Sequence, residues 1–229
     1  MNKIIIDKNS EIDLKDNVVY LDSNDKEVII NISGRVLVDE FVKKDKDSSK
    51  LIINIADNSE LLYNRFSNNN NMNNNIVINQ NNNSSLEFNY SIIAKDKGKL
   101  DFVSNVVGSG NKTNIRVRAI TKDKGSLVLK CVTDNKNNTL DNELLESLKI
   151  LMLNDEESII IPDLLVASNE VAVNHEATIS GINKDELFYL NSKGIDEYTA
   201  KELISDGFII NNLNLSKKDK KELEGCLDE

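Results

Sequence analysis

The sequence is poor in the residues that build most metal, redox and disulfide sites. Its 229 residues include two cysteines, one histidine, one proline and no tryptophan. Two well-separated cysteines, Cys131 and Cys226, do not form a disulfide framework, which favours a reducing compartment such as the cytoplasm. The longest apolar stretches, such as Ser158–Ala167, fall short of the ~18 residues of a membrane span. Met1–Lys8 shows no targeting pattern, so we expect a cytoplasmic protein without a membrane partner.

Positive charge is scarce as well. The chain has 28 Lys and Arg against 38 Asp and Glu, a net charge of −10 and a pI near 4.8. Binding to nucleic acid needs a clustered basic face, and the lysines of Lys217–Lys221 occupy only one face of an expected helix. There is no glycine-rich phosphate loop, so we expect no nucleotide bound by this chain. The acidic runs Asp141–Glu143 and Asp155–Glu157 lack calcium-loop spacing and are interpreted as solvated turns.

Asparagine, in contrast, is abundant. The chain has 35 asparagines, which are densest from Ser67 to Ser85 around one short apolar run, Ile76–Ile78. Asparagine tolerates left-handed backbone angles and forms side-chain turns. We therefore predict an Asn-rich loop region over residues 67–85, with asparagine ladders inside a solenoid as the alternative.

Residues 1–180 have the pattern of a mainly β domain. Short apolar runs rich in Ile, Val and Leu are separated by polar turns, which is typical of strands. In Leu86–Ile92 and Asn114–Ala119 apolar and polar residues alternate, so one face of each strand is expected to be buried. From about residue 60 the runs recur every 10 to 16 residues, with no helix between them. This leaves a sandwich or a stacked β-solenoid, and the lack of clear hairpin turns favours the solenoid.

The pattern becomes helical in residues 181–229. Three helices are predicted, each after a capping residue: Lys184–Lys193 after Asn183, Glu197–Asp206 after Asp196, and Lys217–Leu227 after Ser216. Gly194 and Gly207 are expected to end the first two. Each helix has about ten residues and is too short to be stable alone in water. The region must therefore pack on the β domain, on another chain, or on both.

The junction of these two regions carries a family resemblance. Asn174–Ile195 contains His-Glu-Ala-Thr, Leu-Phe-Tyr-Leu and Ser-Lys-Gly-Ile in the order and spacing of one C-terminal signature. The match continues through Ala200, Leu203, Ile204, Gly207 and Phe208, and the only proline, Pro162, falls on a position of the same pattern. This signature resembles that of the SufB/SufD family, which are scaffold components of the SUF iron–sulfur cluster assembly machinery. Residues 1–145 match in kind only.

The resemblance implies a right-handed parallel β-helix with a small C-terminal α-helical region. It implies that residues 181–229 dock on a SufC-like ABC ATPase and that two copies form a homodimer through the β-helix. The chain would be a minimal SufB-like form, a scaffold and not an enzyme. The expected docking residues are Leu187, Phe188, Tyr189, Leu190, Gly194, Ile195, Ala200, Leu203, Ile204, Gly207 and Phe208.

The resemblance also implies a transient iron–sulfur cluster, shared between chains. Its candidate ligands here are His175, Glu176 and Cys131, although a structural role for each is the simpler interpretation without the family. Neighbouring residues of a strand point to opposite faces, so His175 and Glu176 can share a site only at a strand end or a subunit seam. A four-iron cluster needs about four ligands, so we expect the missing thiolates from a partner. The alternatives are a SufD-like structural subunit without a cluster and a β-solenoid that acts on polysaccharide.

Overall fold

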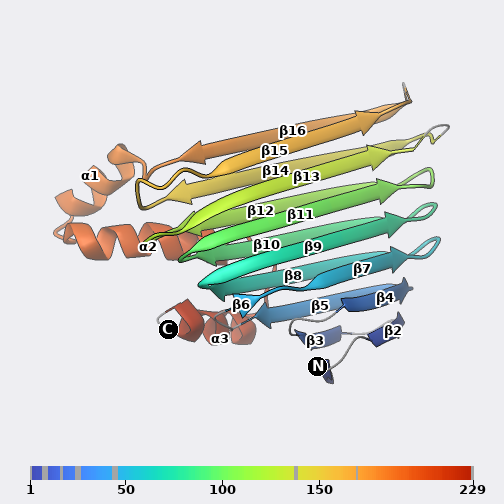
Figure 1. The fold of residues 1–229 in the computed structure, drawn as a ribbon, viewed down its shortest axis with the longest axis horizontal. Helices are drawn as coiled ribbons and strands as arrows, with labels where there is room; N and C mark the ends of the chain where they lie inside the picture. Colours follow the sequence, from blue (N-terminus) through green and yellow to red (C-terminus); the bar gives the residue numbers. More distant parts are fainter. Residues whose placement is uncertain are drawn as a thin grey trace.

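The chain forms a two-layered parallel β-helix with three helices after it (Figure 1). The computed structural model describes residues 2–6, 10–15, 18–23, 27–42, 46–136, 139–168 and 170–227. Successive strands alternate between two sheets, and every pairing in both sheets is parallel. This confirms the solenoid and removes the sandwich, whose strands are antiparallel.

The strand order follows the chain in each sheet. Sheet A contains β1 (Asn2–Ile6), β3 (Val18–Ser23), β5 (Arg35–Val42), β8 (Glu60–Asn69), β10 (Ser85–Ala94), β12 (Lys112–Thr121), β14 (Asn142–Met152) and β16 (Val171–Ser180). Sheet B contains β2 (Ser10–Lys15), β4 (Glu27–Ser33), β7 (Lys50–Ile55), β9 (Asn71–Gln80), β11 (Lys97–Val106), β13 (Ser126–Asn135) and β15 (Ile159–Val166), with the short β6 (Lys46–Asp47) beside β9.

Each turn of the solenoid takes two strands and two corners. From β8 onward, residues paired in sheet A lie 25 to 31 positions apart in the chain. Four corner residues have positive φ angles of 53° to 59°, and all are Asn or Asp: Asn58, Asn83, Asp123 and Asp141. These two residue types tolerate the left-handed region better than other side chains do. The part of the prediction that assigned asparagine to corners is therefore confirmed.

The alternating apolar residues face inward and fill the space between the two sheets. Aromatic rings stack along the axis of the solenoid: Tyr63 and Phe88 have centroids 5.0 Å apart, and Phe88 and Phe102 5.1 Å apart. All three side chains are at most 1% exposed. Because parallel strands repeat the same inward positions, each turn adds another layer to one continuous core.

A buried ion pair interrupts this core near its N-terminal end. Arg65 Nη1 lies 3.0 Å from Glu40 Oε2, and the two side chains are 0% and 1% exposed. The Tyr63 hydroxyl donates to Glu40 Oε2 at 2.8 Å, and Arg65 Nη2 donates to Ser49 Oγ at 2.9 Å. The guanidinium also lies 5.3 Å from the centre of the Tyr90 ring. Both charges are thus paired and hydrogen-bonded inside the solenoid.

The predicted Asn-rich loop over residues 67–85 is wrong. The end of β8 and the whole of β9 occupy most of this segment, and only a tight corner separates β9 from β10. Asn74 is fully buried and accepts a hydrogen bond from the backbone N–H of Ser49 at 3.2 Å. Burial of every second residue in β9 gave this polar sequence a strand conformation that its composition opposed.

Asparagine instead forms a ladder on the outer face of sheet B. The amide of Asn105 donates to Asn79 at 2.9 Å, that of Asn79 to Asn54 at 2.8 Å, and that of Asn54 to Asn31 at 2.9 Å. Asn31 then donates to the carboxylates of Glu11 and Asp13, both at 2.9 Å. All these amide donors point the same way, toward the N-terminal end, where two acceptors of full negative charge end the ladder.

Breaking this ladder is expected to cost stability. Asn79→Ala removes one donated and one accepted side-chain hydrogen bond, so the free energy of unfolding should fall by about 1–2 kcal/mol. Asn73→Ala is the matched control, because Asn73 lies exposed on the same strand outside the ladder and should change less than about 0.5 kcal/mol. Urea denaturation of both variants measures the difference, and equal effects would contradict a role for the ladder.

The three helices begin where they were predicted. α1 spans Lys184–Ser192, α2 Glu197–Ile210 and α3 Lys217–Leu227, so the change from strand to helix falls just after Ser180. Asn183 and Asp196 cap α1 and α2 by accepting from backbone N–H groups. Gly207 does not end α2 as predicted: the helix continues to Ile210, because its last turn packs apolar residues on sheet A. No helix in the described ranges is long and apolar enough to cross a membrane.

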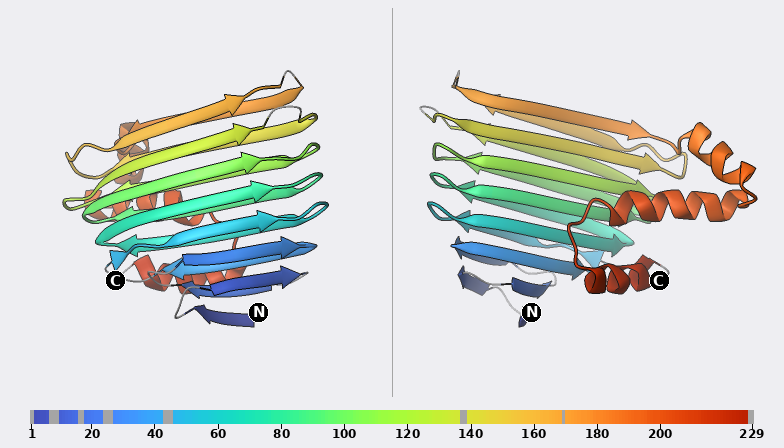
Figure 2. Two further views of the ribbon diagram at one scale, coloured as in Figure 1. Left: turned by 45° about the vertical axis from the view of Figure 1, so that its right-hand side comes forward. Right: turned by 180° about the vertical axis from the view of Figure 1, so that it is seen from behind.

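The C-terminal segment covers the outer face of sheet A, whereas α1 projects past the strand ends (Figure 2). Apolar residues on both sides form a second core: Phe41, Phe66, Ile93, Ile120, Leu151, Ile209, Leu213, Leu215 and Leu223. Asn64 fixes the register of this contact, since its Nδ2 donates to the carbonyl of Asn214 at 3.2 Å and its Oδ1 accepts from the Asn214 N–H at 3.0 Å. The helical region is therefore anchored at its C-terminal end.

Asp39 lies under this segment and should make stability depend on pH. Burial raises the pKa of Asp39 to about 6, Asp219 on α3 raises it further, and the hydrogen bond from Asn64 opposes both. The folded chain therefore holds a proton that the unfolded chain releases near pH 4, so stability falls as the pH rises from about 4 to about 6.

Asp39→Asn keeps the acceptor for Asn64 and removes the buried charge. We expect the variant to be more stable than the wild type by about 2–3 kcal/mol at pH 8 and equal to it below pH 4. Urea midpoints at the two pH values measure this, with the exposed Asp155→Asn as the control. The same gain at both pH values would show that the charge is not its cause.

Candidate functional site

The last turn of the solenoid leaves an open end. β15 and β16 are the outermost strands of their sheets, at the top of Figure 1, and each pairs with one neighbour only among the described strands. Apolar side chains on these strands are exposed to solvent: Ile159, Ile161, Leu165, Val166, Val173 and Ile179, each between 37% and 50%. Pro162, which has no N–H to donate, lies on β15, in agreement with the confinement of strand prolines to edges. This end presents unpaired strand edges and an uncovered apolar core.

Three of the four polar side chains that face inward here come from different strands. Cys131 and Thr133 lie on β13, Glu146 on β14, and His175 on β16, where it pairs in register with Glu146. The Thr133 hydroxyl donates to Glu146 Oε2 at 2.9 Å, and His175 Nδ1 lies 3.7 Å from Glu146 Oε1. Cys131 is fully buried, whereas the His175 side chain is 33% exposed. The structure thus brings together two of the three predicted ligands, Cys131 and His175, through Glu146.

The electrostatics of this cluster keep its thiol protonated. Burial raises the pKa of the Cys131 thiol well above its usual range, and the adjacent Glu146 carboxylate raises it further. Burial also raises the pKa of Glu146, while its contacts with Thr133, Cys131 and His175 lower it. Because iron binds the thiolate, Cys131 must lose its proton before it can act as a ligand.

Glu176 lies on the opposite face of β16 from His175. Its carboxylate is 2.7 Å from Lys149 Nζ and accepts from Ser147 Oγ at 3.0 Å, and these contacts lower the pKa of Glu176. The alternation of the strand therefore separates the two neighbouring candidates, as expected for a regular strand. Only a second chain at the edge of β16 would bring both faces into one site.

The chain alone does not assemble a complete metal site. In the described ranges, no group of three or more His, Cys, Asp and Glu side chains is arranged to hold a metal ion. The side chain of Cys226 lies outside the described residues. Sequence reasoning missed Glu146, although one signal was present: it is the only charged residue among the inward positions Leu144, Leu148 and Ile150 of β14. A charge at a core position of a strand is itself a sign of function.

The expected docking residues divide into two groups. Phe188, Tyr189 and Leu203 are exposed, at 75%, 60% and 51%, and α1 contains no buried residue. Ala200 is fully buried, and Phe208 packs against the second core. A groove of about 470 Å³ between α1 and α2 is lined by Asp185, Glu186, Tyr189, Leu190 and Ile204. The exposed group can contact a partner directly, whereas Ala200 and Phe208 hold the region in place.

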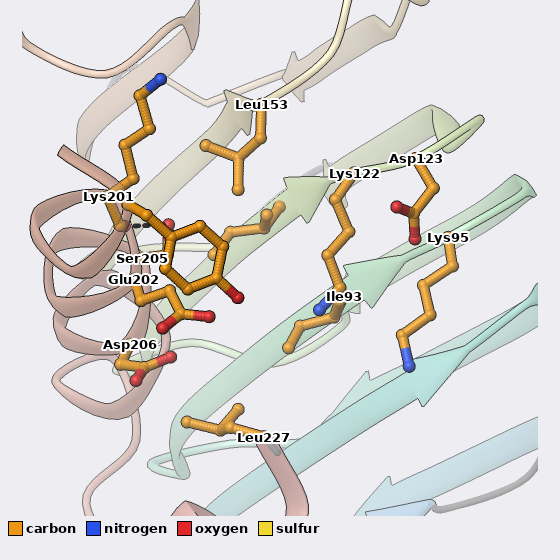
Figure 3. Close-up of a pocket in the computed structure, with 12 residues that line it drawn as sticks. Ile93, Lys95, Lys122, Asp123, Leu153, Lys201, Glu202, Ser205, Asp206 and Leu227 are labelled. Atoms are coloured by element: carbon orange, nitrogen blue, oxygen red, sulfur yellow. Dashed lines mark hydrogen bonds between the residues drawn. The ribbon is translucent and has the colours of Figure 1, made fainter. Parts of the chain in front are cut away.

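A pocket of about 590 Å³ separates part of α2 from sheet A (Figure 3). Lys95 and Lys122, at the ends of strands, line the sheet side, while Glu202 and Asp206 line the helix side. The opposite charges attract across the pocket and favour this orientation of the helix. The part of α2 beside the pocket therefore has less apolar contact with the sheet than its last turn, which carries the buried Ile209.

Comparison with known proteins agrees with this geometry. Residues 43–208, which include β7 to β16 and most of α2, match the family described as "SUF system FeS cluster assembly, SufBD core domain". The chain belongs to the SufBD family. The match contains the open end of the solenoid and the inward cluster around Glu146, so both are features of a SufBD core.

Individual members of the SufBD family are similar over shorter stretches. An iron–sulfur cluster assembly SufBD family protein of Synechocystis is 43% identical over 47 residues, 20% of this chain and 10% of its own length. A relative from Staphylococcus aureus is 38% identical over 60 residues, 26% of this chain and 13% of its own length. One from Staphylococcus saprophyticus is 31% identical over 93 residues, 40% of this chain and 20% of its own length. The chain thus covers at most a fifth of the length of these three relatives.

Proposed function

We propose that this SufBD chain is a scaffold subunit on which iron–sulfur clusters are assembled. The observation that carries the proposal is the position of the inward cluster: Cys131, Glu146 and His175 lie at the open end of a solenoid whose family assembles such clusters. The cluster is the cargo of this scaffold. The chain is expected to do no catalysis of its own and to work in the cytoplasm.

The open end supports a homodimer with a shared site. Edge strands expose unpaired N–H and C=O groups and pair readily with another chain. Pairing of β16 with its counterpart would bury the exposed Val173 and Ile179 and bring a second His175 and Glu176 to the seam. Two chains would then supply ligands from both faces of β16, and further thiolates would come from a partner protein. His175, Glu176 and Cys131 remain the ligands that we propose from this chain.

The helical region supports a second partner, an ABC-type ATPase of the SufC kind. α1 projects away from the solenoid and carries the exposed Phe188 and Tyr189 beside the groove between α1 and α2. An exposed aromatic pair next to a groove is typical of a protein–protein contact. ATP hydrolysis in that partner would reposition the dimer through the helices that pack on sheet A. This chain would bind no nucleotide.

Co-expression with the ATPase encoded beside this gene tests the proposal. We expect a stable complex that takes up iron and sulfide during anaerobic reconstitution and gains the visible absorbance of a cluster. Iron and sulfide analysis of the purified complex, and of the chain alone, provides the measurement. Failure of the two proteins to co-purify would reject the ATPase partnership, and a complex without iron would reject the scaffold role.

His175→Ala should separate ligand binding from assembly of the complex. The side chain is partly exposed on an edge strand, so its loss should leave the complex intact while bound iron falls more than about tenfold. Glu176→Ala removes the outward carboxylate of the same strand and is measured in parallel. Loss of iron in the first variant alone places the site on the inward face, and unchanged iron in both removes the two residues as ligands.

A SufD-like structural subunit without its own cluster is the second candidate. The protonated, fully buried thiol of Cys131 favours it, because such a thiol is not a ready ligand. The same reconstitution distinguishes the two roles: a structural subunit forms the ATPase complex but retains no iron unless a separate scaffold subunit is added.

A further inference from the structure

Glu146 is a buried charge with half of its bonding capacity unused. It is 5% exposed and lies at an inward position of β14 between aliphatic neighbours. Its Oε2 accepts from Thr133, but its Oε1 has no hydrogen-bond partner among the residues that the structure describes. An unsatisfied carboxylate oxygen in such a place costs free energy, so a role in binding is the usual reason for it.

The unsatisfied oxygen is directed at the imidazole of the only histidine. Oε1 lies 3.7 Å from His175 Nδ1, which is longer than a hydrogen bond but within the reach of a small side-chain rotation. Catalytic and binding hydrogen bonds are often long before the ligand is present. Of Cys131, Glu146 and His175, only His175 extends to solvent, so the carboxylate can influence a bound ligand most directly through the ring.

We propose that Glu146 is the positioning residue for His175. Its carboxylate accepts the Nδ1–H of the ring and thereby leaves Nε2, on the other side of the ring, as the free donor atom at the open end of the solenoid. Thr133 holds the carboxylate in place through the other oxygen. Carboxylates paired in this way with a ligating histidine fix its tautomer and make it a stronger donor to a metal. The destination of Nε2, iron, rests on the proposed function, whereas the pairing itself does not.

The single histidine makes the tautomer directly measurable. A long-range ¹H–¹⁵N NMR spectrum of the full chain contains one imidazole, and at pH 9 the neutral ring should carry its proton on Nδ1. Glu146→Leu should change the dominant tautomer to Nε2–H, which an unrestrained histidine side chain prefers. Glu146→Gln keeps an acceptor oxygen and should keep more of the Nδ1–H form. An Nε2–H ring in the wild type would overturn the inference, whatever the variants do.

A second readout separates positioning from the proposed function. In the complex with the ATPase, Glu146→Leu should weaken binding of Fe²⁺, or of Co²⁺ as a spectroscopic probe, by roughly 10- to 100-fold. Glu143→Leu is the control, because Glu143 lies on the same strand, faces outward and pairs with Lys112; it should alter neither tautomer nor affinity. If no form of the complex binds metal, the scaffold role fails while the tautomer result stands. If Glu146→Leu leaves both the tautomer and the affinity unchanged, the positioning role fails.

Discussion

Glu40→Leu is expected to lower the free energy of unfolding by about 3–5 kcal/mol, which is the usual cost of removing one partner of a buried ion pair. The substitution leaves the guanidinium of Arg65, which is 0% exposed, without its carboxylate. It also removes the acceptor of the Tyr63 hydroxyl. Neither group can reach water without opening the solenoid, so both penalties remain in the folded chain. Equilibrium urea denaturation followed by circular dichroism measures the loss.

The double variant Glu40→Leu/Arg65→Met distinguishes a broken pair from a damaged core. Replacing both charges by apolar side chains of similar size often leaves stability unchanged or improves it. We therefore expect the double variant to recover to within about 1 kcal/mol of the wild type. The surface pair Lys112–Glu143, at 3.4 Å and mostly exposed, is the control, and Lys112→Ala should cost less than about 0.5 kcal/mol. A double variant as unstable as the single one would contradict this account.

The sequence predicted the fold where local pattern and burial agree. Leu86–Ile92 alternates strictly, and it forms β10 with its apolar side chains in the core. The caps at Asn183 and Asp196 depend on neighbouring residues only, so they also appeared where expected. Residues 67–85 failed because strand pairing in a solenoid is a long-range effect: Asn74 lies in a strand owing to partners some 25 residues away. Composition alone contains no information about those partners.

The candidate site was less accessible to sequence reasoning. His175 was found because it lies in a motif, but its partner Glu146 lies 29 positions earlier and meets it only through the register of β14 and β16. That register depends on the length of a complete solenoid turn, which is irregular in this chain. Exposure was equally hidden: Ala200 and Phe188 are both apolar residues of the motif, and only packing makes one buried and the other exposed.

Phe188→Asp is expected to weaken binding of the ATPase by about 30- to 1,000-fold without loss of stability. A large aromatic residue that anchors an interface typically contributes about 2–4 kcal/mol to binding. Phe188 is 75% exposed, so its replacement removes almost no contact within the chain. α1 has nine residues and none is buried, and so short a helix is marginal in water unless something packs on it. Calorimetric titration of the purified chain with the ATPase gives the affinity, and urea denaturation gives the stability.

Val107→Asp provides the matched control for this prediction. Val107 is also apolar and 50% exposed, but it follows β11 at the end of the sheets opposite to α1 in Figure 1. The same change of charge at that position should leave the affinity unchanged, so a general effect of added negative charge is separated from loss of an anchor. Leu203→Asp, on the exposed part of α2, should resemble Phe188→Asp if both helices form one surface. Equal affinity for Phe188→Asp and the wild type would move the ATPase contact away from α1 and leave its exposed aromatic residues to a different partner.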